Sequence, residues 1–204
     1  MDIKEQSVLL RPAKPEFDEG LKFAHYLDQA AEGFFRIMLG RESEKIIATA
    51  FIDTGHSLSH ENVIFVDVDT KIVGMSSTFT ERQHRMFSDE PLRRAAKRNA
   101  IRLKLVRTLF APVWRILETI PEGDFYVQGI AIEPELRGAG IGSLLMNDID
   151  DRAKASESNR LSLDVSAKND DARRLYKRLG MVESSTWPNS RFLPTVFFRM
   201  SKYL

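Results

Sequence analysis

Cysteine is absent from this chain of 204 residues. Its absence excludes disulfide bonds, thiolate nucleophiles and cysteine-ligated zinc together, and it is typical of proteins from a reducing compartment. An excess of charge of one sign is also lacking, because 30 basic residues stand against 29 acidic ones. A formal net charge of +1 creates no overall field that attracts nucleic acid. We therefore expect a cytoplasmic protein without a nucleic-acid partner.

Long hydrophobic runs are lacking as well. The first twenty residues, MDIKEQSVLLRPAKPEFDEG, place charges on both sides of a short apolar run, which fits neither a signal peptide nor a membrane span. No later run is long enough to cross a bilayer, so we expect no stable membrane insertion. The composition is otherwise globular, and no linker rich in Gly, Pro or Ser divides it. The sequence predicts one domain over residues 1–204.

The hydrophobic period changes between that of strands and that of helices along the chain. Strands are predicted at residues 7–11, 62–69, 71–79, 124–132, 160–166 and within 194–200. Helices are predicted at residues 16–39, as one or two helices, and at 43–52, 91–120, 141–154 and 170–179. The turn at Asp69 and Thr70 predicts an antiparallel hairpin between the second and third strands. The predicted fold class is mixed α/β.

The segment PELRGAGIGSLL, residues 134–145, places three glycines within five positions and then continues as a helix. A helix N-terminus carries unpaired N–H groups and about half a positive charge, which favours an anion. Glycines lack Cβ, so an anion can approach the backbone to hydrogen-bonding distance. These features predict a phosphate-binding turn.

Two common phosphate-binding patterns match these glycines only in part. The P-loop requires a lysine after its last glycine, and the segment GIGS has none. The dinucleotide-binding fingerprint is nearly met by Gly138, Gly140 and Ser143, with Asp164 as a ribose-binding acid. However, residues 133–137 separate the strand from the first glycine, and only 40 residues follow Asp164. Tight packing of strand against helix, without any ligand, is a further alternative.

The pattern Arg/Gln-x-x-Gly-x-Gly/Ala is met at every specified position by RGAGIG, residues 137–142. This segment resembles the central motif of the GNAT acyltransferases, which bind acetyl-CoA. The flanking segments YVQGIAIEPELRG (126–138) and NDDARRLYKRLGMVE (169–183) resemble the family's fourth strand and the segment that completes its cofactor site. The resemblance is close over residues 125–182 and loose over the first eighty. It implies a mostly antiparallel central sheet, with splayed fourth and fifth strands, flanked by helices.

The resemblance implies acetyl-CoA as co-substrate and no metal. The pyrophosphate would bind the turn formed by Arg137, Gly138, Ala139, Gly140, Ile141, Gly142 and Ser143. The pantetheine arm carries amides and would pair with the strand edge of Ile130, Ala131 and Ile132. A backbone amide of this strand would face the thioester oxygen and stabilise the oxyanion. Asn169 would cap the following helix and contact the pantetheine.

Two side chains are the candidates for proton transfer. Tyr176 matches the family's tyrosine, whose hydroxyl protonates the leaving thiolate, although a half-buried packing role is the alternative. Glu133 is the candidate general base, with Asp124 or a water-mediated route as alternatives, and it would otherwise be a surface carboxylate. The predicted reaction is direct attack on acetyl-CoA by a primary amine of a small molecule or peptide. The alternative from another class of function is a regulatory domain that binds CoA but catalyses no reaction.

His56 and His60 are four residues apart, a spacing that could suggest a metal site. Gly55 and the intervening serines indicate a loop instead, and no carboxylate or cysteine completes a ligand set. The sequence therefore predicts two solvent-exposed histidines.

Residues 81–122 form an insertion of about forty residues relative to a compact member of the family. Within it, residues 91–115 hold eight lysines and arginines and no acidic residue. A basic amphipathic helix of this kind can lie on an anionic membrane, bind an acidic partner or cover the acceptor site. A solvated basic face is the simpler alternative. We interpret the insertion as shaping substrate access or forming the surface of a homodimer.

Overall fold

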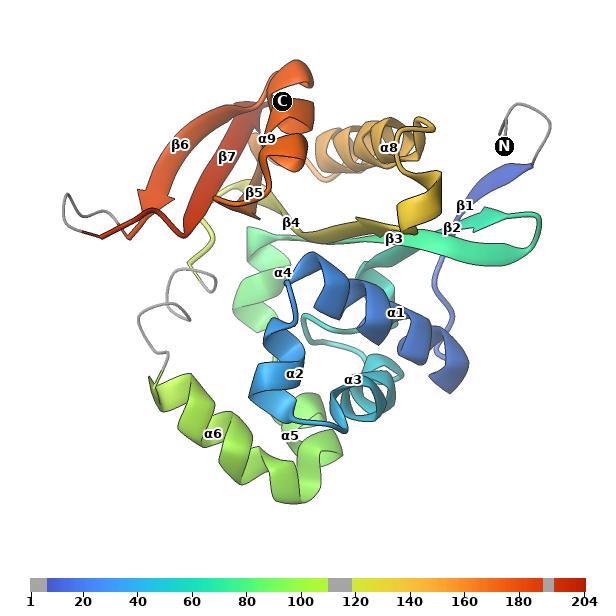
Figure 1. The fold of residues 1–204 in the computed structure, drawn as a ribbon, viewed down its shortest axis with the longest axis vertical. Coiled ribbons are helices and arrows are strands. Elements are labelled where there is room, and N and C mark those ends of the chain that lie inside the picture. The colour runs from blue at the N-terminus through green and yellow to red at the C-terminus, as the bar shows by residue number, and fades with distance from the viewer. Residues whose placement is uncertain (1–6, 110–118, 189–192) are drawn as a thin grey trace.

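A seven-stranded sheet forms the centre of the computed structural model, which describes residues 7–109, 119–188 and 193–204 (Figure 1). The strand order is β1-β2-β3-β4-β5-β7-β6. Only the neighbours β4 and β5 are parallel, and every other neighbouring pair is antiparallel. The mixed, mostly antiparallel sheet expected from the sequence is therefore confirmed.

Most of these strands lie where β-branched and aromatic residues are concentrated in the sequence. The strands are β1 (Val8–Pro12), β2 (Val63–Val68), β3 (Lys71–Thr80), β4 (Asp124–Ile132), β5 (Arg160–Ser166), β6 (Val182–Trp187) and β7 (Phe197–Tyr203). The sequence pattern predicts no strand at β6, and this is wrong. Its sequence VESSTW has a polar centre because it is an exposed edge strand that pairs only with β7 among the described residues.

Helices cover both faces of the sheet (Figure 1). On one face lie α8 (Ile141–Ala155) and α9 (Asp170–Arg178), and on the other lie α1 (Phe17–Ala30), α2 (Phe34–Leu39), α3 (Ser43–Phe51), α4 (Glu81–Met86), α5 (Glu90–Ala96) and α6 (Ala100–Leu109). Single 3-10 turns are η2 (His60–Asn62), η3 (Lys97–Asn99) and η4 (Pro134–Leu136). The helix predicted over 91–120 is thus interrupted by η3, and its residues 110–118 lie outside the described residues. None of the described helices is long and apolar enough to span a membrane.

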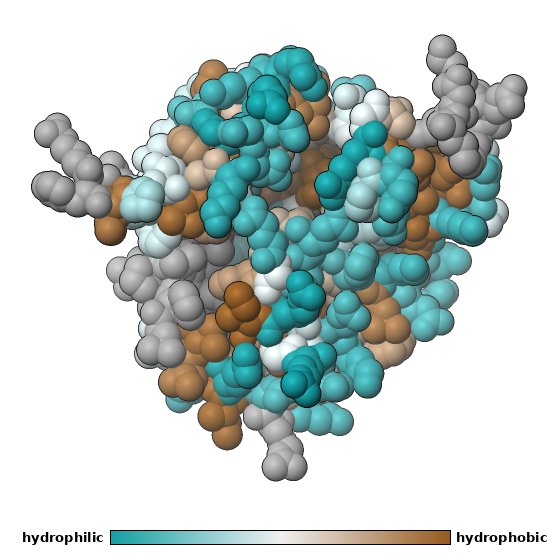
Figure 2. Space-filling view, viewed as in Figure 1, coloured by the Kyte–Doolittle hydropathy of each residue, from teal (hydrophilic) through white to brown (hydrophobic). Residues whose placement is uncertain are grey.

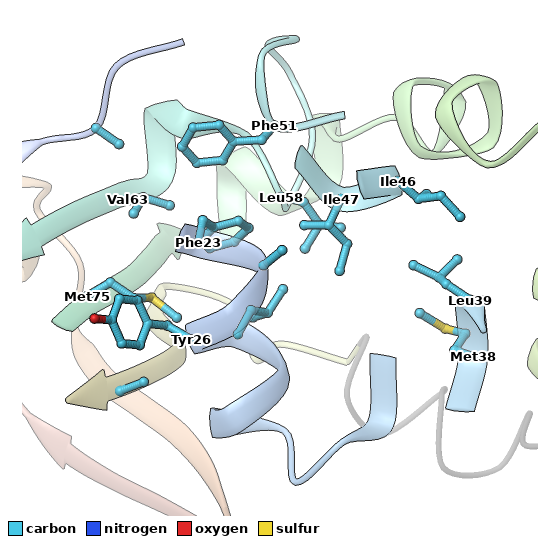
Figure 3. Packing of buried hydrophobic residues seen from close by; sticks show 14 of the residues in the cluster. Phe23, Tyr26, Met38, Leu39, Ile46, Ile47, Phe51, Leu58, Val63 and Met75 are labelled. Carbon is cyan, nitrogen blue, oxygen red and sulfur yellow. The ribbon is translucent and has the colours of Figure 1, made fainter. Parts of the chain in front are cut away.

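The largest hydrophobic cluster lies between the sheet and the helices on the α1 face (Figure 3). Phe23 of α1 and Phe51 of α3 are fully buried there, with ring centroids 5.2 Å apart. Phe65 and Met75 of the sheet belong to the same cluster. A second cluster lies under α8 and joins β4, β5 and β7. Both faces of the central strands are therefore buried, which fixes the positions of the helices relative to the sheet.

His56 is buried and His60 is half-buried, so the prediction of two exposed histidines is wrong. Only 3% of it is exposed, its Nε2–H donates to the carbonyl of Ala50 at 2.9 Å, and its Nδ1 accepts from the N–H of Leu58 at 3.3 Å. Burial lowers the pKa of this imidazole. His56 thus gives the carbonyl of Ala50, near the end of α3, a second donor beside the N–H of Asp53. Among the described residues, no three His, Asp or Glu side chains form a group that could hold a metal.

Substituting Phe51→Ala tests the cluster on the α1 face. Removing this ring leaves a cavity, so we expect the free energy of unfolding to fall by about 3–5 kcal/mol. The matched control is Met86→Ala, because Met86 is 80% exposed and its truncation should change stability by less than about 0.5 kcal/mol. Urea denaturation of both variants measures the difference, and equal stabilities would contradict this packing.

Candidate functional site

A wedge opens between β4 and β5. The two strands pair over Asp124–Val127 and Arg160–Leu163 only, and Val127 and Leu163 form the last pair. Beyond that point β4 remains paired with β3, and β5 remains paired with β7. The facing edges of β4 and β5 therefore carry backbone groups that do not pair with each other, and the expected splay of these two strands is confirmed.

A β-bulge lies at the apex of this wedge. Ser77 of β3 stands opposite Gly129 and Thr78 opposite Val127, so Gln128 is an extra residue in β4. The Ser77 hydroxyl donates to Oε1 of Gln128 at 2.9 Å. A bulge redirects the backbone of its strand, and here it does so where β4 leaves β5. The sequence pattern does not predict this feature, and Gly129 inside a strand is the one signal that could have indicated it.

The predicted glycine turn connects the end of β4 to α8 through η4. Gly138 and Gly140 have φ values of +81° and +91°, which side chains with a Cβ rarely adopt. A Cβ at either position would meet nothing within 4 Å, so backbone conformation and not crowding requires glycine there. Gly142 differs, because its Cβ would lie 3.5 Å from Ile132 and 3.6 Å from Leu175. Tight packing alone therefore does not explain the first two glycines.

The first turn of α8 is open to an incoming anion. Gly140 is its N-cap residue, and no side chain caps the free N–H groups there. Arg137 is exposed just before this turn and forms no ion pair with the described residues. The N–H groups, the helix dipole and the Arg137 guanidinium together favour a phosphate.

Helix α9 lies beside the start of α8, since Leu175 approaches Gly142. The Asn169 side chain accepts from the N–H of Ala172 at 3.1 Å, which shows that it caps α9. Tyr176 is half-buried against the cluster that contains Val127 and Leu163, the last paired residues of β4 and β5.

Burial raises the pKa of Tyr176 to about 12. Its hydroxyl has no hydrogen-bond partner among the described residues. Tyr176 is consequently a protonated phenol at neutral pH that remains free to donate.

Glu133 lies on the other side of the sheet from Tyr176. Its Oε1 accepts from the hydroxyl of Tyr26 in α1 at 2.9 Å, and that hydroxyl also lies 3.1 Å from the carbonyl of Ile72. Burial and the neighbouring carboxylate raise the pKa of Tyr26. The neighbours of the two residues lie close to each other, because a Cβ at Gly142 would be 3.5 Å from Ile132 and 3.6 Å from Leu175. The two predicted proton-transfer groups therefore approach the start of α8 from β4 and from α9.

An open pocket of about 520 Å³ lies beside Glu133, between α1 and the start of β3. Asp18 and Lys22 line it from α1, and Lys71 lines it from β3. Gln29 of α1 also donates to the carbonyl of Ile132 at 3.2 Å. Helix α1 therefore holds the end of β4 and leaves the carboxylate of Glu133 beside solvent.

One ion pair joins the paired parts of β4 and β5, and a second joins β5 to β7. Asp124 is buried, and its Oδ1 accepts from Nε of Arg160 at 2.7 Å, so this alternative base is engaged. Asp164 accepts from Nε and Nη2 of Arg199 at 2.9 and 2.7 Å and from the Tyr126 hydroxyl at 3.1 Å. Both oxygens of Asp164 are thus occupied, which disfavours the role of a ribose-binding acid. The sequence does not indicate this network because its members are far apart along the chain.

Comparison with known proteins identifies the family of this chain. A family profile described as the acetyltransferase (GNAT) family matches residues 9–181. The chain belongs to this family. Acyl transfer is the reaction of this family, and the resemblance seen in the glycine motif is confirmed.

Similar proteins extend this result. A Bacillus subtilis (strain 168) protein named for alanine N-acetylation of ribosomal protein bS18 is 33% identical over 72 residues. That match covers 35% of this chain and 44% of the relative, so the chain spans less than half the length of this curated relative. Among solved structures, one described as an acetyltransferase has a TM-score of 0.68 at 21% identity and covers 96% of this chain and 98% of its own. An N-acetyltransferase from Staphylococcus aureus Mu50 has a TM-score of 0.65 at 14% identity, with coverages of 95% and 100%. At these sequence identities, the two structures show that the fold is shared.

The two kinds of glycine in the turn predict opposite effects on stability. Gly140→Ala places a Cβ in the left-handed region, which should lower the free energy of unfolding by about 1–2 kcal/mol. Gly142→Ala lies in the first turn of α8 with ordinary contacts, so it should be neutral or raise stability by about 0.5–1 kcal/mol. Urea denaturation of the pair distinguishes them, and an equal loss in both would show that crowding governs Gly140 as well.

Proposed function

We propose that this GNAT protein transfers an acetyl group from acetyl-CoA to a primary amine. The observation that carries the proposal is the uncapped glycine turn of α8 beside a wedge whose two edges lack backbone pairing with each other. The first feature suits a pyrophosphate and the second suits a chain that carries amides. The acceptor is a small molecule or a peptide, and the name of the Bacillus relative favours a peptide N-terminus.

The cofactor-binding residues are those of the turn and of the strand edge before it. Backbone N–H groups of residues 137–143 would hold the pyrophosphate, with the Arg137 guanidinium beside it. The edge of Ile130, Ala131 and Ile132 would pair with the pantetheine amides, and Asn169 would contact this arm from the start of α9. A backbone N–H near the bulge would stabilise the negative charge that develops on the thioester oxygen.

Tyr176 is the proposed donor to the leaving group. The amine nitrogen forms a bond to the thioester carbon, the carbon–sulfur bond breaks, and the thiolate requires a proton. A phenol of pKa about 12 is protonated throughout the neutral range, so it can hydrogen-bond to the sulfur at any physiological pH. The reference pKa of a thiol is lower, about 8.5, so the hydroxyl would stabilise the departing thiolate first by donating a hydrogen bond to it.

Glu133 is the proposed acceptor of the amine proton. Its carboxylate lies beside the open pocket between α1 and β3, which favours proton transfer through water over direct contact. Tyr26 fixes the carboxylate by the hydrogen bond at 2.9 Å, so the receiving oxygen has a defined position.

Substituting Tyr176→Phe removes the hydroxyl and keeps the ring. We expect kcat to fall by about 10²-fold or more, with little change in the affinity for acetyl-CoA, because the ring still packs against the cluster under α8. Tyr203→Phe is the matched control, since Tyr203 is exposed at the end of β7. Steady-state release of free thiol measures both variants, and an unchanged rate across pH would remove Tyr176 from the reaction.

Turnover itself distinguishes the enzyme from a CoA-binding domain that lacks activity. We expect thiol release from acetyl-CoA with at least one member of a panel of polyamines, amino acids, lysine peptides and peptides with N-terminal alanine. Mass spectrometry of the product should show one added acetyl group on the amine. Stabilisation by acetyl-CoA without turnover for any acceptor would instead support the binding domain.

A further inference from the structure

The outward face of α6 is apolar. Successive residues of an α-helix are about 100° apart, so Ile101 and Leu105 lie opposite Leu103 and Val106, which face the cluster on the α1 face. Ile101 is 79% exposed and Leu105 is 59% exposed. Figure 2 shows apolar side chains at the lower left of the molecule, where Figure 1 places α6. This outward face of α6 is therefore a stripe of large apolar residues in contact with solvent.

Basic residues flank the stripe without any acidic residue. Lys104 lies on one side of Ile101 and Leu105 around the helix, and Arg102 lies on the other. From Lys97 to Leu109 the sequence holds five basic residues and no acidic one. Neither Lys97 nor Lys104 forms an ion pair with the described residues. The charge beside the stripe is thus uncompensated on this helix.

Helix α2 extends the same kind of surface. Arg102 donates through Nε and Nη2 to the carbonyl of Ile37 at 3.3 and 2.9 Å, which ties α6 to α2. Ile37 itself is 57% exposed, and the helix sequence FFRIML contains no acidic residue. The carboxylate of Asp28 in α1, which lies beside α2, is paired with Arg36.

We propose that this face of α6, with Ile101 and Leu105 at its centre and Lys97, Arg102 and Lys104 around them, binds the surface of an anionic lipid bilayer. Apolar side chains gain from entering the boundary between headgroups and acyl chains, while the cations gain from anionic headgroups. Nucleic acid would attract the cations through its phosphates, but it would leave Ile101 and Leu105 exposed to solvent. A bilayer satisfies both components of the surface at once.

The geometry also leaves the proposed acetyl-CoA site accessible. Helices α6 and α8 lie on opposite sides of the sheet (Figure 1). A bilayer against α6 therefore does not cover the glycine turn. Binding of α6 to a bilayer is independent of acyl transfer. The experiment that tests it therefore measures binding and not activity.

Vesicle co-sedimentation tests the proposal. The chain of 204 residues is mixed with vesicles of phosphatidylcholine alone or of phosphatidylcholine with phosphatidylglycerol. We expect it to sediment with the anionic vesicles and to remain in solution with the neutral ones. The double variants Ile101→Ser with Leu105→Ser, and Lys97→Gln with Lys104→Gln, should each lose roughly tenfold or more in partitioning. Met86→Ser, an exposed methionine on α4, is the matched control and should bind like the unmodified protein.

Two outcomes would overturn the proposal. One is a protein that stays in solution with both kinds of vesicle while circular dichroism shows it to be folded. The other is retained binding by the Ile101/Leu105 double variant, together with complete displacement from vesicles by soluble poly-glutamate. That second result would assign the surface to an acidic protein partner, because the apolar side chains would then contribute nothing.

Discussion

The separation of β4 from β5 after Val127 and Leu163 is the constraint on which the site depends. Backbone N–H and carbonyl groups inside a sheet normally pair with a neighbouring strand. Here β3 and β7 support the outer edges of the two strands, and the inner edges diverge. A ligand with its own amides can occupy this space, and the helices that follow β4 and β5, α8 and α9, flank it.

Polar side-chain contacts lie at both ends of the stretch over which β4 and β5 pair. Asp124 of β4 pairs with Arg160 of β5 where the pairing begins, and Tyr126 of β4 reaches Asp164 of β5 just beyond it. Arg199 then extends this contact to β7. Buried ion pairs add little net stability, but removal of one partner is costly because the other charge remains buried. Such contacts can fix where the strands separate, which sets the position of Tyr176 relative to β4.

Local patterns in the sequence predict much of this architecture. The glycine turn, the Asn169 cap and the hairpin of β2 and β3 depend on residues close together in the chain, so their signals are visible there. The bulge at Gln128 and the network around Asp164 depend on partners tens of residues away. The burial of His56 is not predicted either, because its loop folds back onto the end of α3. Edge strand β6 lacks the apolar alternation that identifies a strand, because it buries little surface.

The central claim is that acetyl-CoA occupies the wedge and the glycine turn. Amide hydrogen exchange, followed residue by residue by NMR with and without acetyl-CoA, tests this claim most directly. The account predicts added protection at residues 129–132 on the edge of β4 and at residues 138–144 around the start of α8, with no change in α6. Protection absent from both segments at saturating acetyl-CoA would contradict it.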